Sequence, residues 1–257
     1  MLSMYMLVSG EWNMSFLIGL MIIACLYGSL LRRFTALKLY HRQPIFFFIG
    51  LLLIYVTMGS PLSTISHLSF SFHMFFMSIH YFIIPPLLLL GIPYPFFQQM
   101  QKKPWIKKLC FPSNIALYTF ALLFFSYHLQ ITLNLFSQYP TIHTSYMLLM
   151  FYLSFIIWWP LLSPHQYSKV GKKAYAFKSS LLIMPACFFF IFSGILGGIG
   201  SLPLHTELNA TLCLPSNFSP SDLLPFPFNS RIDQSAAGIL MIGMHKFGMV
   251  ITKPMKK

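Results

Sequence analysis

The sequence contains very few acidic residues. Its 257 residues include four Asp and Glu against seventeen Lys and Arg, which gives a formal net charge of +13. Charged residues make up 8% of the chain and hydrophobic residues 56%, whereas soluble domains average about 25% charged residues. A soluble protein of this size needs more polar surface than this composition supplies. The sequence therefore excludes an ordinary soluble fold and indicates an integral membrane protein.

Cysteine is scarce and unpatterned. Cys25, Cys110, Cys187 and Cys213 form no Cys-x-x-Cys pair and no evenly spaced framework, so the sequence does not indicate a disulfide scaffold. Two of them fall inside apolar runs. We interpret the cysteines as small buried hydrophobic residues.

Seven long apolar runs account for the hydrophobic composition. Each is close to the length of about 20 residues that a helix needs to cross a bilayer. The runs are continuous rather than alternating with period two, so a membrane β-barrel is not expected. We predict an all-α polytopic membrane protein, a seven-helix transmembrane bundle that forms one integral membrane domain over residues 1–257. The predicted spans are 14–31, 45–62, 67–92, 114–135, 144–163, 179–200 and 234–252.

Lysine and arginine alternate between the loops. Sixteen of the seventeen bases follow the first, third or fifth span or lie near the C-terminus, and Arg231 is the exception. Basic loops remain in the cytoplasm, so the N-terminus is predicted outside and the C-terminus in the cytoplasm. The segment 201–233 then becomes an extracytoplasmic loop before the last span. This topology explains the positive charge, so we expect no nucleic-acid partner and some attraction to anionic lipid.

Histidine, methionine and one aspartate stand out inside or beside the spans. Ionisable groups at membrane depth are costly, which makes them functional candidates. His73 and Met77 are four residues apart, as are His143 and Met147, so each pair shares a helix face. His80 follows His73 by seven residues and is expected on nearly the same face, two turns deeper. The candidate set, which the predicted topology brings mostly to the outer leaflet, is His73, Met77, His80, His128, His143, Met147, Asp233 and Met241.

Imidazole and thioether groups dominate this set. Thioethers favour Cu(I) and imidazole suits copper generally, whereas calcium and magnesium need carboxylates that the chain lacks. We predict a copper site for Cu(I), with Asp233 orienting a histidine or helping to capture the ion. The alternative is structural, because methionine is common in apolar spans and a membrane histidine often bonds to a neighbouring helix. His80 has the simpler alternative of bonding Ser or Tyr on a neighbour. His41, His165 and His245 are predicted at the cytoplasmic interface, away from the site.

Two consecutive prolines interrupt the third span. Pro85 and Pro86 lack backbone N–H groups and should kink the helix. The carbonyl groups that they leave free need partners from neighbouring helices. The run Trp158-Trp159-Pro160 ends the fifth span and is predicted in the aromatic belt at the cytoplasmic interface.

Several runs of residues resemble a known family. Those of the third span are Ser60-Pro61-Leu62, Phe72-His73-Met74 and Pro85-Pro86-Leu87-Leu88-Leu89-Leu90-Gly91-Ile92-Pro93. The others extend from His143 to Trp158-Trp159-Pro160-Leu161 and over Asp233-Gln234-Ser235-Ala236-Ala237-Gly238-Ile239-Leu240-Met241. Together, over about residues 44–245, they are similar to the multi-span cytochrome c oxidase assembly factor CtaG family of bacteria.

The resemblance implies a role in maturing a haem–copper cytochrome c oxidase of the caa type in the bacterial plasma membrane. It implies copper delivery without catalysis, with oxidase subunits, the lipid bilayer and a copper donor protein as partners. Met77 stands where many members have a second histidine, and Tyr146-Met147 stands where many have Glu-His. Both changes replace an imidazole by a thioether and so favour Cu(I) further.

Other functions fit parts of the pattern. A copper or small-solute transporter would use the kinked third span, but it needs polar groups through the inner half of the bundle, where they are sparse. Haem binding would take two of His73, His128 and His143 as axial ligands. A scaffold that contacts oxidase subunits would use the histidines only for packing. The sequence contains no nucleophile–base–acid arrangement, phosphate loop or cofactor fingerprint, so an enzyme is not expected.

Overall fold

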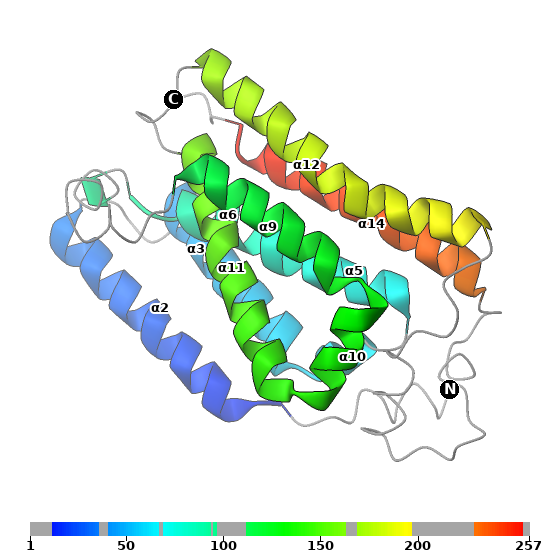
Figure 1. Ribbon diagram of the computed structural model, residues 1–257. Helices are drawn as coiled ribbons and strands as arrows, with labels where there is room; N and C mark the ends of the chain where they lie inside the picture. The colour runs from blue at the N-terminus through cyan, green and yellow to red at the C-terminus, as the bar shows by residue number, and fades with distance from the viewer. Residues whose placement is uncertain are drawn as a thin grey trace.

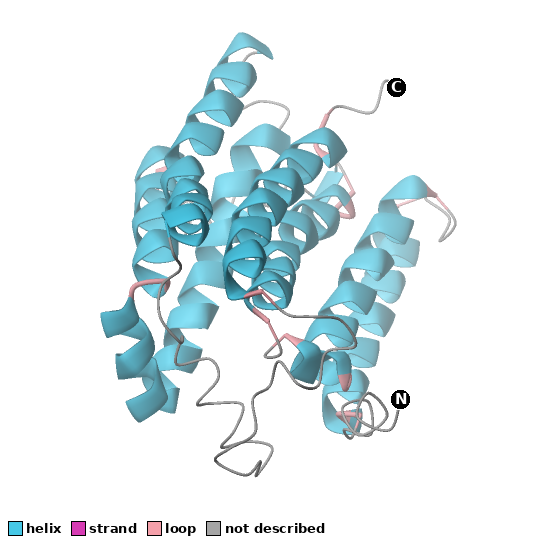
Figure 2. Cartoon of the chain, turned by 90° about the vertical axis from the view of Figure 1, so that its right-hand side faces the viewer, coloured by secondary structure: helices cyan, strands magenta, loops and turns pink. Residues whose placement is uncertain are grey.

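The computed structural model describes residues 12–35, 41–66, 69–93, 95–96, 112–162, 169–196 and 229–253. Within these ranges every regular element is a helix and no strand occurs (Figure 1 and Figure 2). The prediction of an all-α fold is therefore confirmed. Cys110, Cys213, His165 and nearly all of the predicted loop 201–233 lie outside the described residues.

The helices follow the predicted spans along the chain, and each predicted span coincides with one helix or one run of helices. Two of the runs contain a π-helical turn. In chain order the elements are α2 (Met14–Phe34), α3 (Arg42–Ile54) with the π-helix η1 (Tyr55–Gly59), α4 (Leu62–Ile65), α5 (Phe70–Ser78) with the π-helix η2 (Ile79–Ile83) and α6 (Ile84–Leu90), α9 (Ser113–Tyr127), α10 (Gln130–Gln138), α11 (Pro140–Leu162), α12 (Lys169–Leu196) and α14 (Ser230–Ile251).

Among the residues that the structure describes, five helical stretches are long and apolar enough to cross a membrane, and α9 with α10 makes a sixth if the bent pair is one span. The five are Met14–Phe34, Arg42–Gly59, Phe70–Leu90, Pro140–Leu162 and Gly171–Leu196. The helix α14, the predicted seventh span, is not among them. A multi-pass membrane protein is therefore supported, while the count of seven and the external N-terminus remain predictions.

The predicted fourth span, 114–135, is not one continuous helix. It breaks after Tyr127, and the axis of α10 is turned by 81° from that of α9. The His128 ring explains the break, because its Nδ1 lies 2.7 Å from the Phe124 carbonyl oxygen. That oxygen is the acceptor for the His128 amide in a continuing α-helix, and the amide donates instead to Phe125, 3.2 Å away. A side chain that competes with the backbone in this way ends the helix.

The helices α12 and α14 lie side by side along much of their length (Figure 1), and α14 also packs against α5. A Cβ atom on Gly238 would lie 2.6 Å from the Cys187 carbonyl oxygen, so the two backbones approach each other as only glycine permits. Cys187 is buried there, as predicted. Cys25 is exposed, contrary to the prediction, because α2 stands at the edge of the bundle.

The helical stretch Phe70–Leu90 continues through Pro85 and Pro86, which lie at the start of α6 where the π-helix η2 ends, so the kink stays a prediction. The missing N–H groups of the two prolines leave a gap in the backbone hydrogen bonding, called the proline break below, and neighbouring helices contact the carbonyl groups that it leaves free. An α-helix would pair these two positions with the Tyr81 and Phe82 carbonyl groups. The Trp158 indole nitrogen donates a 2.9 Å hydrogen bond to the Tyr81 oxygen. The Phe82 oxygen lies against Gly248 of α14, so close that no Cβ atom would fit between them.

This arrangement corrects two predictions about the cytoplasmic interface. Trp158 is only 1% exposed and lies inside the bundle rather than in an aromatic belt. His245 is also buried, and its ring centroid lies 5.1 Å from that of Phe82 and 6.0 Å from that of Trp158. Both side chains are buried because they pack around the proline break, which the pattern of interfacial tryptophans does not reveal.

We expect Trp158→Phe to destabilise the protein by about 1–3 kcal/mol, because it leaves the buried Tyr81 carbonyl without its donor. The measurement is thermal unfolding of the detergent-solubilised protein, followed by circular dichroism. Trp12→Phe is the control, since Trp12 is largely exposed. Equal unfolding midpoints for Trp158→Phe and the wild type would contradict a structural role for this bond.

Candidate functional site

Tyr127, the last residue of α9, lies where three helices bring histidines together. The His73 ring of α5 lies nearly parallel to the tyrosine ring, with 6.0 Å between centroids and 7° between planes. The His143 ring of α11 stacks at 5.9 Å, and its Nε2 lies 3.2 Å from the tyrosine hydroxyl oxygen. Three helices that are distant in sequence thus place two of the predicted imidazoles around one buried phenol.

His128 follows Tyr127 directly and is enclosed by aromatic rings. Its ring centroid lies 5.2 Å from that of Phe124 and 4.9 Å from that of Phe190. While Nδ1 is engaged with the Phe124 carbonyl oxygen, Nε2 is buried and has no hydrogen-bond partner among the described residues. A buried imidazole nitrogen without a hydrogen-bond partner can bind a metal ion. Otherwise its burial costs folding free energy, because a polar atom is removed from water without compensation.

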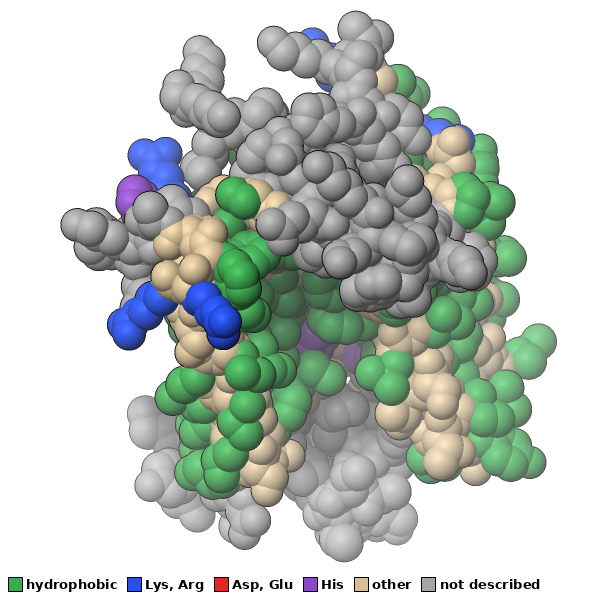
Figure 3. Space-filling view, turned by 90° about the vertical axis from the view of Figure 1, so that its left-hand side faces the viewer, with side chains coloured by type: hydrophobic (Ala, Val, Ile, Leu, Met, Phe, Trp, Pro, Cys, Tyr) green, Lys and Arg blue, Asp and Glu red, His purple; other side chains and the backbone are tan. Residues whose placement is uncertain are grey.

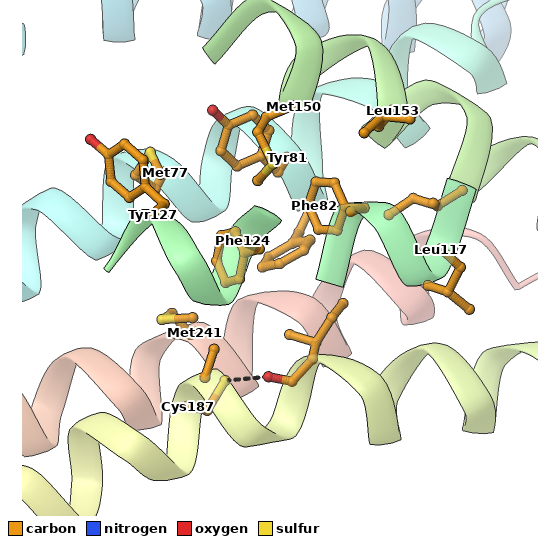
Figure 4. Close-up of a cluster of buried hydrophobic side chains, with 14 of the residues drawn as sticks. Met77, Tyr81, Phe82, Leu117, Phe124, Tyr127, Met150, Leu153, Cys187 and Met241 are labelled. Atoms are coloured by element: carbon orange, nitrogen blue, oxygen red, sulfur yellow. Dashed lines mark hydrogen bonds between the residues drawn. The ribbon is translucent and has the colours of Figure 1, made fainter. Parts of the chain in front are cut away.

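The predicted methionines occupy two parts of the same core. The Met147 sulfur accepts a 3.2 Å hydrogen bond from the Tyr81 hydroxyl. In Figure 4 the Met77 and Tyr127 side chains project into the same region from α5 and α9. Met241 projects from α14 toward Cys187 and is completely buried. Met77 therefore lies near Tyr127 and Met147 lies on Tyr81, whereas Met241 belongs to the packing of α14 on α12.

Asp233 binds the N-terminus of α5. Its carboxylate accepts hydrogen bonds from the Phe70 amide at 2.6 Å, from the Ser71 amide at 3.2 Å and from the Ser71 hydroxyl. Negative charge at this end of a helix interacts favourably with the unpaired amides and the helix dipole. The described structure therefore ties Asp233 to the start of the helix that carries His73, rather than to a histidine ring.

The comparison with protein families supplies the identity. The family model of the cytochrome c oxidase caa3 assembly factor matches residues 25–252, nearly the whole chain. The chain belongs to this family. No curated protein and no solved structure matches it. The residues around Tyr127 and the Asp233 contact therefore lie within the region that defines the caa3 assembly factors.

His80 does not join the other histidines of this assembly factor. Its Nε2 lies 2.9 Å from the Thr57 hydroxyl oxygen of η1. The π-helix η2 begins at Ile79, and a π-helix turns by less per residue than an α-helix. The expectation that His80 shares the face of His73 assumed a regular α-helix up to His80, and it stays a prediction. The alternative of a hydrogen bond to a neighbouring helix is the arrangement observed, with threonine as the partner.

The donor set around Tyr127 limits which metals this caa3 assembly factor can hold there. Among the described residues, no group of three or more His, Cys, Asp or Glu side chains is arranged to hold a metal ion. Figure 3 shows one face of the molecule, on which hydrophobic side chains predominate and histidine side chains are partly visible between them.

Two tyrosines of the site were missed in the sequence. Tyr127 contacts His73 and His143, and Tyr81 holds the Met147 sulfur. Each tyrosine is next to a histidine in the sequence, Tyr127 to His128 and Tyr81 to His80. This adjacency was the one feature of the sequence that could have indicated a role for the tyrosines in the site. A tyrosine near the end of a span is usually an interfacial anchor, which is why it did not indicate a site.

Proposed function

We propose that this member of the caa3 oxidase assembly factor family receives Cu(I) beneath the outer face of the membrane and passes it to an apo-oxidase subunit. The gathering of His73 and His143 at Tyr127, with Met77 and Met147 one turn further along α5 and α11, carries the proposal. His128 adds a third imidazole nearby, and Asp233 anchors the helix that carries His73.

The donors suit a soft monovalent ion. Two imidazoles and two thioethers offer Cu(I) neutral nitrogen and sulfur ligands, and the near absence of carboxylates disfavours calcium and magnesium. Transfer would proceed by ligand exchange, in which each donor of this protein is replaced by a donor of the recipient. Copper stays Cu(I) throughout, so no electron donor or acceptor is required. A copper donor protein on the outer side would load the site in the same way.

Two tyrosine hydroxyls lie beside the donor atoms that copper would use. The Tyr81 O–H group donates to Met147 sulfur, and the Tyr127 oxygen lies 3.2 Å from His143 Nε2. A thioether sulfur has two lone pairs, so Met147 can keep the Tyr81 hydrogen bond while its second lone pair binds copper. Copper binding through His143 Nε2 would displace the Tyr127 hydroxyl from that nitrogen. The hydroxyls thus hold the two donors in position before the ion arrives.

The decisive test is a double variant. His73→Ala/His143→Ala is expected to lose the Cu(I) that the detergent-purified wild type binds in an anaerobic titration against a chromogenic chelator. His41→Ala is the matched control, since His41 is exposed outside the Tyr127 site, and it should bind as the wild type does. Unchanged copper stoichiometry in a correctly eluting double variant refutes the site. A Soret band in the purified wild type would favour the haem alternative instead.

A further inference from the structure

The short helix α10 (Gln130–Gln138) has an unusual position. It joins α9 to α11 and lies across their neighbouring ends (Figure 1), turned by 81° from α9. Its nine residues, QITLNLFSQ, include no charged side chain. The helix α11 that follows has 23 residues, which at 1.5 Å per residue is about 35 Å, longer than the hydrocarbon core of about 30 Å. A helix of this length can cross the core completely, and α10 lies at its N-terminal end, where a membrane boundary is expected.

The side chains of α10 divide into three faces, because successive residues rotate by about 100°. Leu133 and Phe136 face the protein, and Phe136 is buried. Ile131 and Leu135 form a second, apolar face that the described part of the chain leaves uncovered, with exposed fractions of 83% and 43%. The third face is polar and exposed, and it carries Asn134 and Ser137, while Gln138 ends the helix on one side of Ile131.

This order of faces fits a helix that lies flat at a bilayer surface. Such helices bury an apolar face at the level of the headgroups and acyl chains and turn a polar face to water. Tyr139, at the junction with α11, is 51% exposed, and tyrosine is enriched at this depth. Two features, the uncovered apolar face and the exposed tyrosine beside it, thus indicate lipid as the partner.

The buried face connects α10 to the Tyr127 site. The Phe136 ring stacks on the His143 ring with 5.0 Å between centroids, and it lies 5.6 Å from the Tyr127 ring. On either side of α10 the backbone leaves the α-helical conformation, at Leu129 and at Tyr139. The helix therefore covers His143 through one side chain and is joined to its neighbours through two non-helical residues.

We propose that α10 is docked on the lipid surface of the outer leaflet through Ile131 and Leu135, and that this docking holds Phe136 over the His143–Tyr127 pair. The assignment to the outer leaflet rests on the predicted topology, and the role as a cover rests on the proposed copper site. Lipid contact at Ile131 and Leu135 then controls how readily water and copper reach the imidazole from outside.

The test measures the depth of individual residues in the full chain. The protein, with its four cysteines replaced, is reconstituted into phosphatidylcholine–phosphatidylglycerol vesicles. Single nitroxide labels are attached in I131C, L135C, N134C and S137C. Collision with oxygen, which partitions into lipid, is compared with collision with a water-soluble nickel chelate. We expect oxygen to dominate at residues 131 and 135, and nickel to dominate at 134 and 137.

Other outcomes overturn the proposal. Dominant nickel contact at all four labels places α10 in water. Low contact with both reagents at residues 131 and 135 shows that a protein surface, from a second copy, covers this face. The copper titration is independent of these labels. If the expected pattern of oxygen and nickel contact is missing while copper still binds, the docking of α10 is rejected and the copper site is retained. If the pattern is present while copper does not bind, the copper site is rejected and the docking is retained.

Discussion

Gly248→Ala is expected to destabilise the protein by about 3 kcal/mol, because the added methyl group would overlap atoms that cannot move away without shifting a helix. The added Cβ atom would overlap the Phe82 carbonyl oxygen and lie 2.9 Å from Cη2 of the Trp158 ring. A backbone oxygen cannot move aside by changing rotamer, so α14 itself must shift. Such a shift also separates His245 from the rings of Phe82 and Trp158.

Gly243→Ala is the matched control for this prediction. It lies on the same helix, and a Cβ atom there meets nothing within 4 Å. Alanine at such a position gains up to about 1 kcal/mol in helix propensity over glycine, so the two substitutions should shift the unfolding midpoint in opposite directions. Thermal unfolding in one detergent provides the comparison. Equal midpoints for the two variants would show that α14 adjusts freely at the proline break.

The proline break shows what the sequence reveals about the fold and what it does not. The missing N–H groups of Pro85 and Pro86 are evident in the sequence, so both the break and the need for outside partners were predictable. The partners themselves were not, since Trp158 and Gly248 are distant in the chain and meet the break only through packing. Trp158 therefore resembled an interfacial residue in the sequence and is a core residue in the fold.

The candidate site was predictable to a similar extent. Spacing and depth correctly brought His73 and His143 to one region, because both lie in the turns of α5 and α11 that meet the end of α9. The bend after Tyr127 was not predictable, because residues 114–135 contain no proline or glycine and the His128 side chain causes the break. The π-helical turn at Ile79 was also not predictable, because hydropathy contains no signal for it.

Asp233→Ala is expected to destabilise the protein by about 2–3 kcal/mol, the scale of hydrogen bonds to a charged acceptor at a helix N-terminus. The substitution removes the acceptor for two amides and one hydroxyl in the first turn of α5. The effect extends to the Tyr127 site, because the His73 amide bonds to the Ser69 carbonyl within this same turn. Fraying of the turn displaces the His73 ring from Tyr127, so we also expect weaker Cu(I) binding by the purified variant.

Two further variants distinguish a structural role of Asp233, in which it acts as a latch by bonding α14 to the first turn of α5, from direct coordination of copper by its carboxylate. Ile232→Ala changes the adjacent residue, which is largely exposed, and should leave both stability and copper binding unchanged. Asp233→Asn keeps the shape and one acceptor oxygen, but its amide group faces the Phe70 and Ser71 donors. If Asp233 acts through α5, copper affinity and unfolding midpoint fall together across Asn and Ala. Loss of copper at an unchanged midpoint would instead make the carboxylate a ligand and contradict the latch.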